Sequence, residues 1–286
     1  PSRRSSDSGW MSSRVTEASH VPDPRAKAQA RAYAVLGIIA FCGLALWLRL
    51  GAGYAVLDAL LLAALLAAVP GLSMAQVPLI KGMTIDRLPA YWSSILTLWL
   101  LGMVCWLVGT RVDGVSAIGI VLLPIGPMVG WSVALTAAGM GIILLFRWIG
   151  GRVGVTETLL LRGLLPRTGE ERRVFALLSV AAGTGEELAY RGYLIPMLAP
   201  VLGLGAAATV STLVFGLMHG YQGRLGILRT TLMGAVLAWG FIASGSLIPV
   251  MIAHTAIDLI AGIAIGDWLL SPEPDFGVEG AESTLS

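Results

Sequence analysis

Long apolar runs separated by short polar segments dominate the chain from residue 31 to residue 270. A helix that crosses the hydrocarbon core of a bilayer needs about 20 apolar residues, and runs of this length predict about eight transmembrane helices. Their ranges are 31–49, 54–80, 91–109, 125–148, 173–199, 203–220, 226–244 and 246–270. The pattern therefore predicts an all-α fold, a polytopic membrane bundle.

The segments outside these runs suggest how the chain is divided. Residues 1–30 are polar and rich in Ser and Arg, and residues 271–286 are acidic, so both are predicted to be disordered tails. Residues 150–172 mix leucines with Arg and Glu and predict a connector that lies at the membrane surface. The connector separates N-terminal transmembrane helices at 31–149 from a transmembrane core at 173–270.

The positive charges predict the orientation of the bundle. Cytoplasmic loops of membrane proteins carry an excess of Lys and Arg. Here the loops on the opposite side hold only Arg49 and Arg111, so both termini are predicted to be cytoplasmic. The cationic residues on the cytoplasmic side are Arg3, Arg4, Arg14, Arg25, Lys27, Arg31, Lys81, Arg87, Arg147, Arg152, Arg162, Arg167, Arg172, Arg173, Arg224 and Arg229.

Composition supports a multi-pass integral membrane protein. The mean hydropathy is +0.81, and charged residues make up 13% of the chain, whereas soluble domains carry about a quarter. The lipid bilayer is therefore an expected partner. Basic and aromatic residues are not interleaved as binding of single-stranded nucleic acid requires, so no nucleic-acid partner is expected.

Three charged residues lie in the middle of the fifth apolar run: Glu186, Glu187 and Arg191. Each costs at least a few kcal/mol at the centre of a bilayer, about 2.5 to 3.5 kcal/mol on insertion scales. Residues four apart share a helix face, so Glu187 can neutralise Arg191, while Glu186 shares its face with Tyr190. Glu186 is therefore the candidate working carboxylate, a general base that activates water.

Two later runs add histidines to this set. His219 follows Phe215 by four residues, and His254 precedes Asp258 by four. Two His and a Glu form the ligand set of many hydrolytic zinc sites, so Glu186, His219 and His254 are candidate zinc ligands. Without metal, Glu186 and one histidine could activate water, and the other histidine with Asp258 could steady the oxyanion. Both alternatives stay open at this point.

Each residue alone has a structural explanation, because single buried histidines and Glu–Arg pairs often only pack or pair. Their joint occurrence on three nearby runs favours function, since each buried ionisable group carries its own insertion cost. A proton-coupled transporter is a second hypothesis. The ionisable groups are confined to the C-terminal half, whereas inverted repeats would spread them over both halves. A scaffold or immunity protein that has lost catalysis is the third.

The ordered motifs resemble the CPBP family, which includes CAAX prenyl proteases, bacteriocin-processing enzymes and abortive-infection proteins. The motifs are EExxxR at Glu186, Glu187 and Arg191, FxxxH at Phe215 and His219, and HxxxD at His254 and Asp258. The resemblance covers roughly residues 170–265 and implies an intramembrane endopeptidase with a cytoplasm-facing cavity. It implies Glu186 as the base, His219, His254 and Asp258 as further catalytic residues, and Glu187 and Arg191 as supporting residues.

One residue departs from the eukaryotic-type prenyl proteases, which have Asn where this chain has Asp258. A carboxylate is a poorer oxyanion donor than an amide but a better ligand or imidazole partner. The resemblance therefore leaves three substrate classes: a prenylated protein, a leader-bearing peptide or another membrane protein. We expect cleavage near the cytoplasmic leaflet, in the plasma membrane of a prokaryote.

Overall fold

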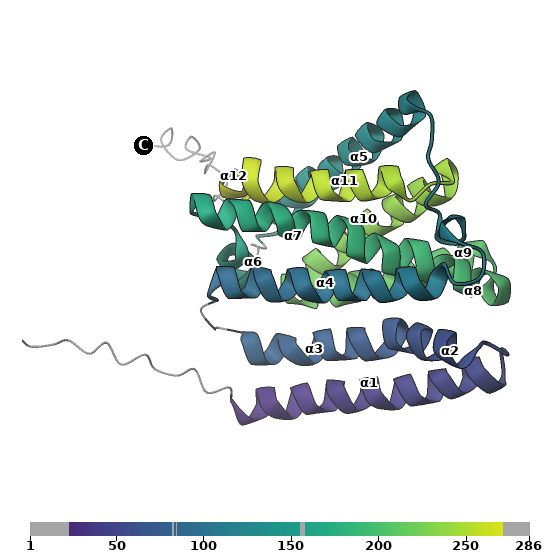
Figure 1. Cartoon of the computed structure of the whole chain (residues 1–286). Helices are drawn as coiled ribbons and strands as arrows, with labels where there is room; N and C mark the ends of the chain where they lie inside the picture. Colours follow the sequence, from purple (N-terminus) through teal and green to yellow (C-terminus); the bar gives the residue numbers. More distant parts are fainter. Residues whose placement is uncertain (1–22, 82, 84, 155–157, 271–286) are drawn as a thin grey trace, which may run out of the picture.

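The computed structural model describes residues 23–81, 83, 85–154 and 158–270 (Figure 1). Most of the predicted N-terminal tail and all of the C-terminal tail lie outside the described residues. The N-terminal tail was predicted to extend to residue 30, but a helix begins at Pro24. Proline is favoured in the first helical turn, and the Asp23 side chain accepts a hydrogen bond from the Arg25 backbone N–H.

All regular elements within the described residues are helical, as predicted. They are α1 (Pro24–Leu50), α2 (Val56–Ala63), η1 (Ala64–Ala68), α3 (Val69–Ile80), α4 (Arg87–Gly109), η2 (Val115–Ile118), α5 (Ile125–Val153), α6 (Leu159–Leu164), α7 (Gly169–Glu187), η3 (Leu188–Leu194), α8 (Ile195–Leu202), α9 (Leu204–Met218), η4 (Gly220–Gln222), α10 (Gly223–Ser244), α11 (Ile248–Leu259), η5 (Ile260–Ala264) and α12 (Gly266–Leu270).

Five helices among the described residues are long and apolar enough to cross a membrane, rather than about eight. They are Pro24–Leu50, Val56–Ile80, Arg87–Gly109, Ile125–Val153 and Gly220–Ser244. The remaining three predicted runs are also helical, but two of them, Leu204–Met218 and Ile248–Ala264, are short. The third runs from α7 through η3 to α8 and carries the charges at 186, 187 and 191. The number of crossings and the orientation therefore stay predictions.

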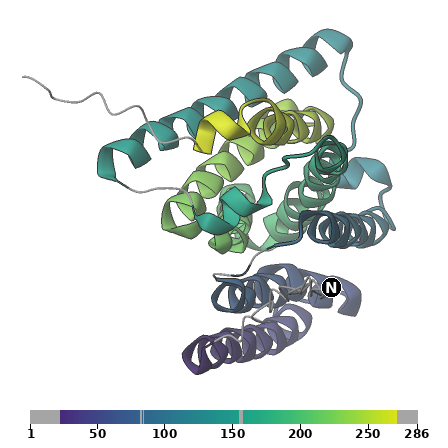
Figure 2. The ribbon, with the colours of Figure 1, turned by 90° about the vertical axis from the view of Figure 1, so that its left-hand side faces the viewer.

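The first three helices form a hairpin at one side of the molecule. Figures 1 and 2 show α1 packed against α2, η1 and α3, with α4 to α12 gathered on one side of this hairpin. The hairpin contacts the rest through α2 on α4, η1 on η3 and α3 on α9 and η4. The contacts made by η1, α2 and α3 hold the hairpin against the elements that carry the motifs.

A buried ionic cluster joins the hairpin to η3. Asp58 of α2 is 3% exposed and pairs with Arg111, whose Nη1 lies 2.9 Å from Oδ1. The Tyr193 hydroxyl of η3 donates to the same Oδ1 at 2.9 Å. The expectation that ionisable groups are confined to the C-terminal half was wrong, because Asp58 lies inside the second predicted run. Its charge is tolerated there because Arg111 and Tyr193 both satisfy it.

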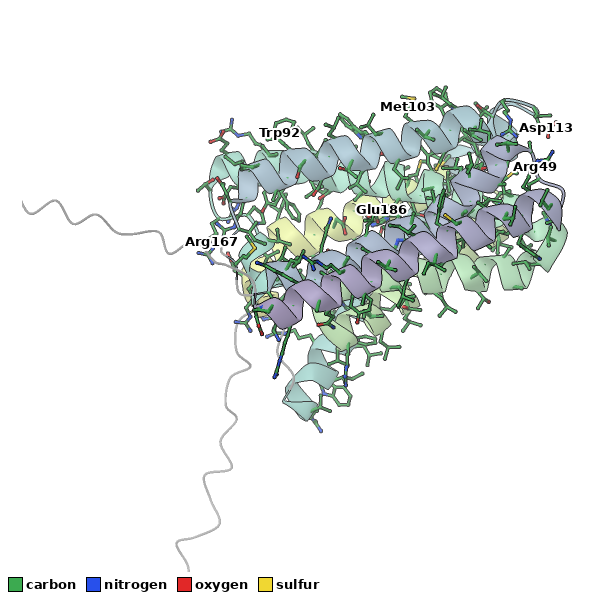
Figure 3. The ribbon with its side chains drawn as sticks, turned by 90° about the horizontal axis from the view of Figure 1, so that it is seen from below. Arg49, Trp92, Met103, Asp113, Arg167 and Glu186 are labelled. Atoms are coloured by element: carbon green, nitrogen blue, oxygen red, sulfur yellow. The ribbon has the colours of Figure 1, made fainter. Side chains whose placement is uncertain are left out.

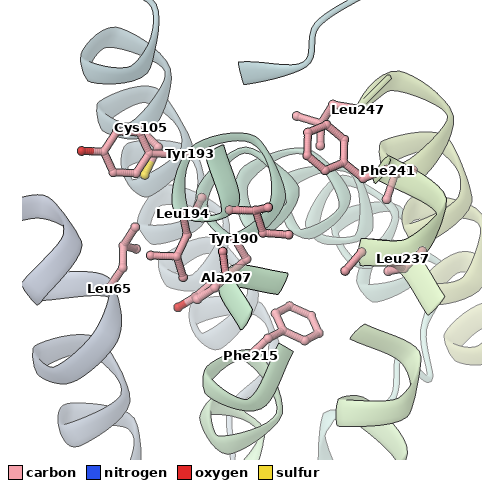
Figure 4. Packing of buried hydrophobic residues seen from close by; sticks show 14 of the residues in the cluster. Leu65, Cys105, Tyr190, Tyr193, Leu194, Ala207, Phe215, Leu237, Phe241 and Leu247 are labelled. Atoms are coloured by element: carbon pink, nitrogen blue, oxygen red, sulfur yellow. The ribbon is translucent and has the colours of Figure 1, made fainter. Parts of the chain in front are cut away.

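The main apolar core lies where η3 meets α9 and α10. Tyr190, Tyr193 and Leu194 of η3 pack with Phe215 of α9, and all are at most 2% exposed (Figure 4). The Tyr190 and Phe215 rings meet edge to face, with centroids 5.6 Å apart. The core therefore surrounds the segment that directly follows the two glutamates.

Helix α7 begins with a capping box at the end of the connector. The Thr168 side chain accepts from the Glu171 backbone N–H, and the Glu171 carboxylate accepts from the Thr168 backbone N–H. The backbone N–H groups of Arg167 and Thr168 hold the pKa of Glu171 below its usual value. These bonds fix where the helix starts, and thus the register of Glu186 and Glu187 along it.

Glycine allows α7 to approach α11 closely. A Cβ added to Gly183 would lie 2.1 Å from the Thr255 hydroxyl and 2.8 Å from the Thr255 backbone nitrogen. Thr255 directly follows His254, so this contact sets the distance between the helices that carry the glutamates and His254. Only a residue without a side chain fits this position.

We therefore expect Gly183→Ala to destabilise the protein by about 1 to 3 kcal/mol, the usual cost of overpacking. The measurement is the melting temperature of the purified protein in mild detergent. Gly43→Ala on α1 is the matched control, because an added Cβ there meets nothing within 4 Å. Equal melting temperatures for the two variants would contradict the close contact of α7 and α11.

Candidate functional site

Glu187 and Arg191 form the buried ion pair that their spacing predicts. Arg191 Nη1 lies 2.9 Å from Glu187 Oε1, and both side chains are fully buried. Arg191 Nη2 also donates to the Gly234 backbone carbonyl at 3.2 Å, and its guanidinium lies 4.2 Å from the centre of the Phe215 ring. The pair therefore ties η3 to both α9 and α10.

A π-helical segment begins immediately after the glutamates and contains Arg191. Such segments are rare and are often found at functional sites. Inside η3 the Tyr190 backbone carbonyl accepts a hydrogen bond from the buried Ser211 hydroxyl at 2.6 Å. The Tyr190 hydroxyl, predicted to share the face of Glu186, contacts the Met218 sulfur instead. Tyr190 therefore supports the site by packing in the core.

His254 is held by Glu187 rather than by Asp258. Its Nδ1 lies 2.7 Å from Glu187 Oε1, whereas its Nε2 lies 3.8 Å from Asp258 Oδ2, beyond hydrogen-bond reach. Because Glu187 is ion-paired with Arg191, it accepts, so His254 Nδ1 carries the hydrogen. The sequence could not give this contact, because it depends on the rotation of α7 against α11.

Glu186 lies on the other side of the same histidine. Its Oε2 is 3.9 Å from His254 Nε2, and its side chain is 11% exposed. Seen from below, Glu186 lies between the end of the bundle marked by Arg167 and the end marked by Arg49 and Asp113 (Figure 3). Glu186 is thus partly accessible at middle depth, while Glu187 is fully buried.

His219 lies at the level of Glu186 because α9 is short. The helix has 15 residues, or about 22 Å, less than the roughly 30 Å of a bilayer core. His219 follows its last residue, and its ring lies 4.9 Å from that of Phe215, which in turn lies 6.1 Å from that of His254. The Phe215 ring therefore contacts both histidine rings and separates them. His219 Nδ1 lies 2.9 Å from the Phe215 carbonyl. Because a carbonyl oxygen only accepts, Nδ1 carries the ring hydrogen and donates it to this bond.

Asp258 is the most exposed member of the set. Its side chain is 36% exposed, against 10% for His254 and 11% for Glu186. It lies one turn along α11 from His254 and faces the same Nε2 as Glu186 does. Asp258 therefore forms the edge of the site nearest the surface of the protein.

The predicted zinc ligands are not arranged as a metal-binding group. Within the described residues, no group of three or more His, Cys, Asp or Glu side chains is placed so that it could hold a metal ion. One ring nitrogen of each histidine donates, to the Phe215 carbonyl in one case and to Glu187 in the other, which leaves the other ring nitrogen as a possible ligand. Zinc binding by Glu186, His219 and His254 therefore stays a prediction.

Several apolar helices of membrane length indicate a multi-pass membrane protein, and a buried set of carboxylates and histidines lies among its helices. A family model matches part of the chain. Residues 168–260 match the type II CAAX prenyl endopeptidase Rce1-like family. This match confirms the resemblance to CPBP proteases, and it supports a protease that acts on peptides within a lipid bilayer. No curated protein and no solved structure matches the chain.

Proposed function

We propose that the protein is an intramembrane endopeptidase in which Glu186 activates a water molecule. The observation that carries the proposal is the placement of Glu186 beside His254, with that histidine fixed by the fully buried Glu187–Arg191 pair. A base must be held in one position to act efficiently. The Glu187–Arg191 ion pair holds His254 beside Glu186, and the pair itself does not face the substrate.

The chemistry follows from the position of His254 beside Glu186. His254 donates Nδ1–H to Glu187 and presents Nε2 to the carboxylates of Glu186 and Asp258, where Nε2 can form a hydrogen bond with a water molecule. Glu186 takes a hydrogen from that water as the water oxygen attacks the carbonyl carbon of the substrate. Glu186 then returns that proton to the amide nitrogen while the C–N bond breaks. Asp258, at the edge, can accept a hydrogen bond from a backbone N–H of the substrate.

Cleavage of a defined peptide tests the proposal. The probe is a fluorogenic peptide ending in a farnesylated Cys-aliphatic-aliphatic-X sequence, compared with the same peptide without the lipid. Purified protein in mild detergent is expected to cleave at least one of them. Cleavage of both at equal rates would indicate a substrate chosen by its peptide alone. Cleavage of neither, by folded protein, would support the scaffold alternative.

The proposed chemistry uses only the side chains of the chain, so we expect activity to survive removal of metal ions. The measurement is cleavage of the probe before and after dialysis against a chelator, with zinc content per chain determined in parallel for wild type and His219→Ala. Loss of activity on chelation, recovered with zinc, would replace this scheme with zinc bound by Glu186, His219 and His254. Bound zinc would then polarise the carbonyl group or activate water.

A further inference from the structure

The turn that follows His219 carries a tyrosine that the sequence motifs do not include. Tyr221 lies in η4, between α9 and α10. Its ring centroid is 6.0 Å from that of His219, with an angle of 36° between the planes. Tyr221 therefore lies directly beside a candidate site residue.

The Tyr221 hydroxyl is held by a network that leaves its own hydrogen unused. Gln222 Nε2 donates to the hydroxyl oxygen at 3.1 Å. The Gln222 side-chain oxygen in turn accepts from Arg229 Nη2 at 2.9 Å and from the Thr230 hydroxyl at 3.3 Å. Among the hydrogen bonds of the described residues, none is donated by the Tyr221 O–H. The oxygen is fixed, and its hydrogen is available to a ligand.

The backbone of the turn is held from two other elements. The Thr158 hydroxyl donates to the Tyr221 carbonyl at 3.2 Å, and the Ser73 hydroxyl of α3 donates to the Met218 carbonyl at 2.7 Å. Both hydroxyls lie outside the residues that match the family. Two fixed points, one on each side of His219, keep the turn in a single conformation.

The remaining site residues offer few donors. His219 and His254 each use Nδ1–H, toward the Phe215 carbonyl and Glu187 respectively, and Nε2 of His254 already faces the carboxylates of Glu186 and Asp258 at 3.9 and 3.8 Å. Arg191 is turned away, toward Glu187 and the Gly234 carbonyl. Addition of water to a carbonyl group creates negative charge on its oxygen, which needs a donor. The Tyr221 hydroxyl offers one.

We propose that the Tyr221 hydroxyl donates a hydrogen bond to the carbonyl oxygen of the bond being cleaved and stabilises the negative charge that forms there. This inference rests on the proposed function. The tyrosine keeps its proton throughout: the water oxygen forms the new C–O bond, Glu186 holds the proton from water, and the oxyanion collapses as the C–N bond breaks. Tyr221 is thus a further catalytic residue.

Tyr221→Phe tests this role, because it removes the hydroxyl and keeps the ring on His219. With the farnesylated peptide as the probe, we expect kcat to fall about 100- to 1,000-fold, as on loss of one oxyanion donor, while KM changes less than about threefold. Tyr33→Phe on α1 is the matched control and should leave both constants unchanged. Tyr33 lies beside Gln29 near the start of α1, far along the chain from the motifs.

A second pair of variants tests the same role if Tyr221→Phe does not fold. Thr158→Val removes the bond to the Tyr221 carbonyl, whereas Thr158→Ser keeps a hydroxyl. We expect kcat to fall only in Thr158→Val, together with a lower melting temperature, because the Thr158 hydroxyl also accepts a hydrogen bond from the Leu161 N–H at the start of α6. An unchanged kcat in both Tyr221→Phe and Thr158→Val, with cleavage by wild type, would overturn this inference alone. Failure of wild type to cleave either peptide would overturn the proposed function and this inference together.

Discussion

Replacement of Glu186 by glutamine is expected to lower the rate of peptide cleavage by about 100-fold or more. Glutamine has nearly the same shape as glutamate but cannot take a proton from water. Because Glu186 makes no direct hydrogen bond to His254 across 3.9 Å, the substitution should leave the fold intact. The measurement is kcat with the farnesylated or the unmodified peptide at equal amounts of protein.

Glu170→Gln is the control for this experiment. Glu170 lies on the same helix but in its first turn, where it is exposed. It should therefore retain the wild-type rate. Equal cleavage by Glu186→Gln and wild type would remove Glu186 from the role of the base and leave Asp258 as the next carboxylate to test.

Loss of Arg191 is expected to be the most destabilising single change at the site. Arg191→Met leaves the Glu187 carboxylate fully buried without its cation, and removal of one member of a buried pair typically costs about 3 to 5 kcal/mol. One oxygen of that carboxylate, Oε2, already has no hydrogen-bond partner among the described residues. Only His254 would then remain to satisfy it. The measurement is the free energy of unfolding in mild detergent.

The double variant Glu187→Gln with Arg191→Met separates charge from packing. It removes both charges, so it should recover part of the stability that Arg191→Met loses. Arg172→Met is the control, because Arg172 is exposed near the start of α7 and should cost less than about 1 kcal/mol. If Arg191→Met were no less stable than Arg172→Met, the buried pair would not hold the site together.

The sequence predicted the helical fold and the family because both depend on local patterns. Apolar runs mark helices, and a four-residue spacing brings Glu187 to Arg191 within one helix. The site residues also lie on segments whose helical state follows from composition. These features need no knowledge of how one helix turns against another.

The contacts between helices could not be predicted in the same way. His254 bonds to Glu187 because Gly183 lets α7 approach α11, and neither spacing nor composition fixes that rotation. The level of His219 depends on the end of α9, which is shorter than the apolar run around it suggests. Asp58 was overlooked because its partners, Arg111 and Tyr193, come from distant parts of the chain. Tyr221 belongs to no motif and is recognised only by its neighbours.

The cluster of Asp58, Arg111 and Tyr193 also bears on where the working unit of this protein ends. The family match starts at residue 168, yet the Tyr193 hydroxyl inside it donates a hydrogen bond to Asp58, a carboxylate more than a hundred residues earlier. A fragment cut at the start of the match would leave that buried phenol and the Met218 carbonyl without their partners. The stretch that matches the family therefore does not contain all the contacts that hold its own site in place, and a fragment limited to it would be expected to lose stability.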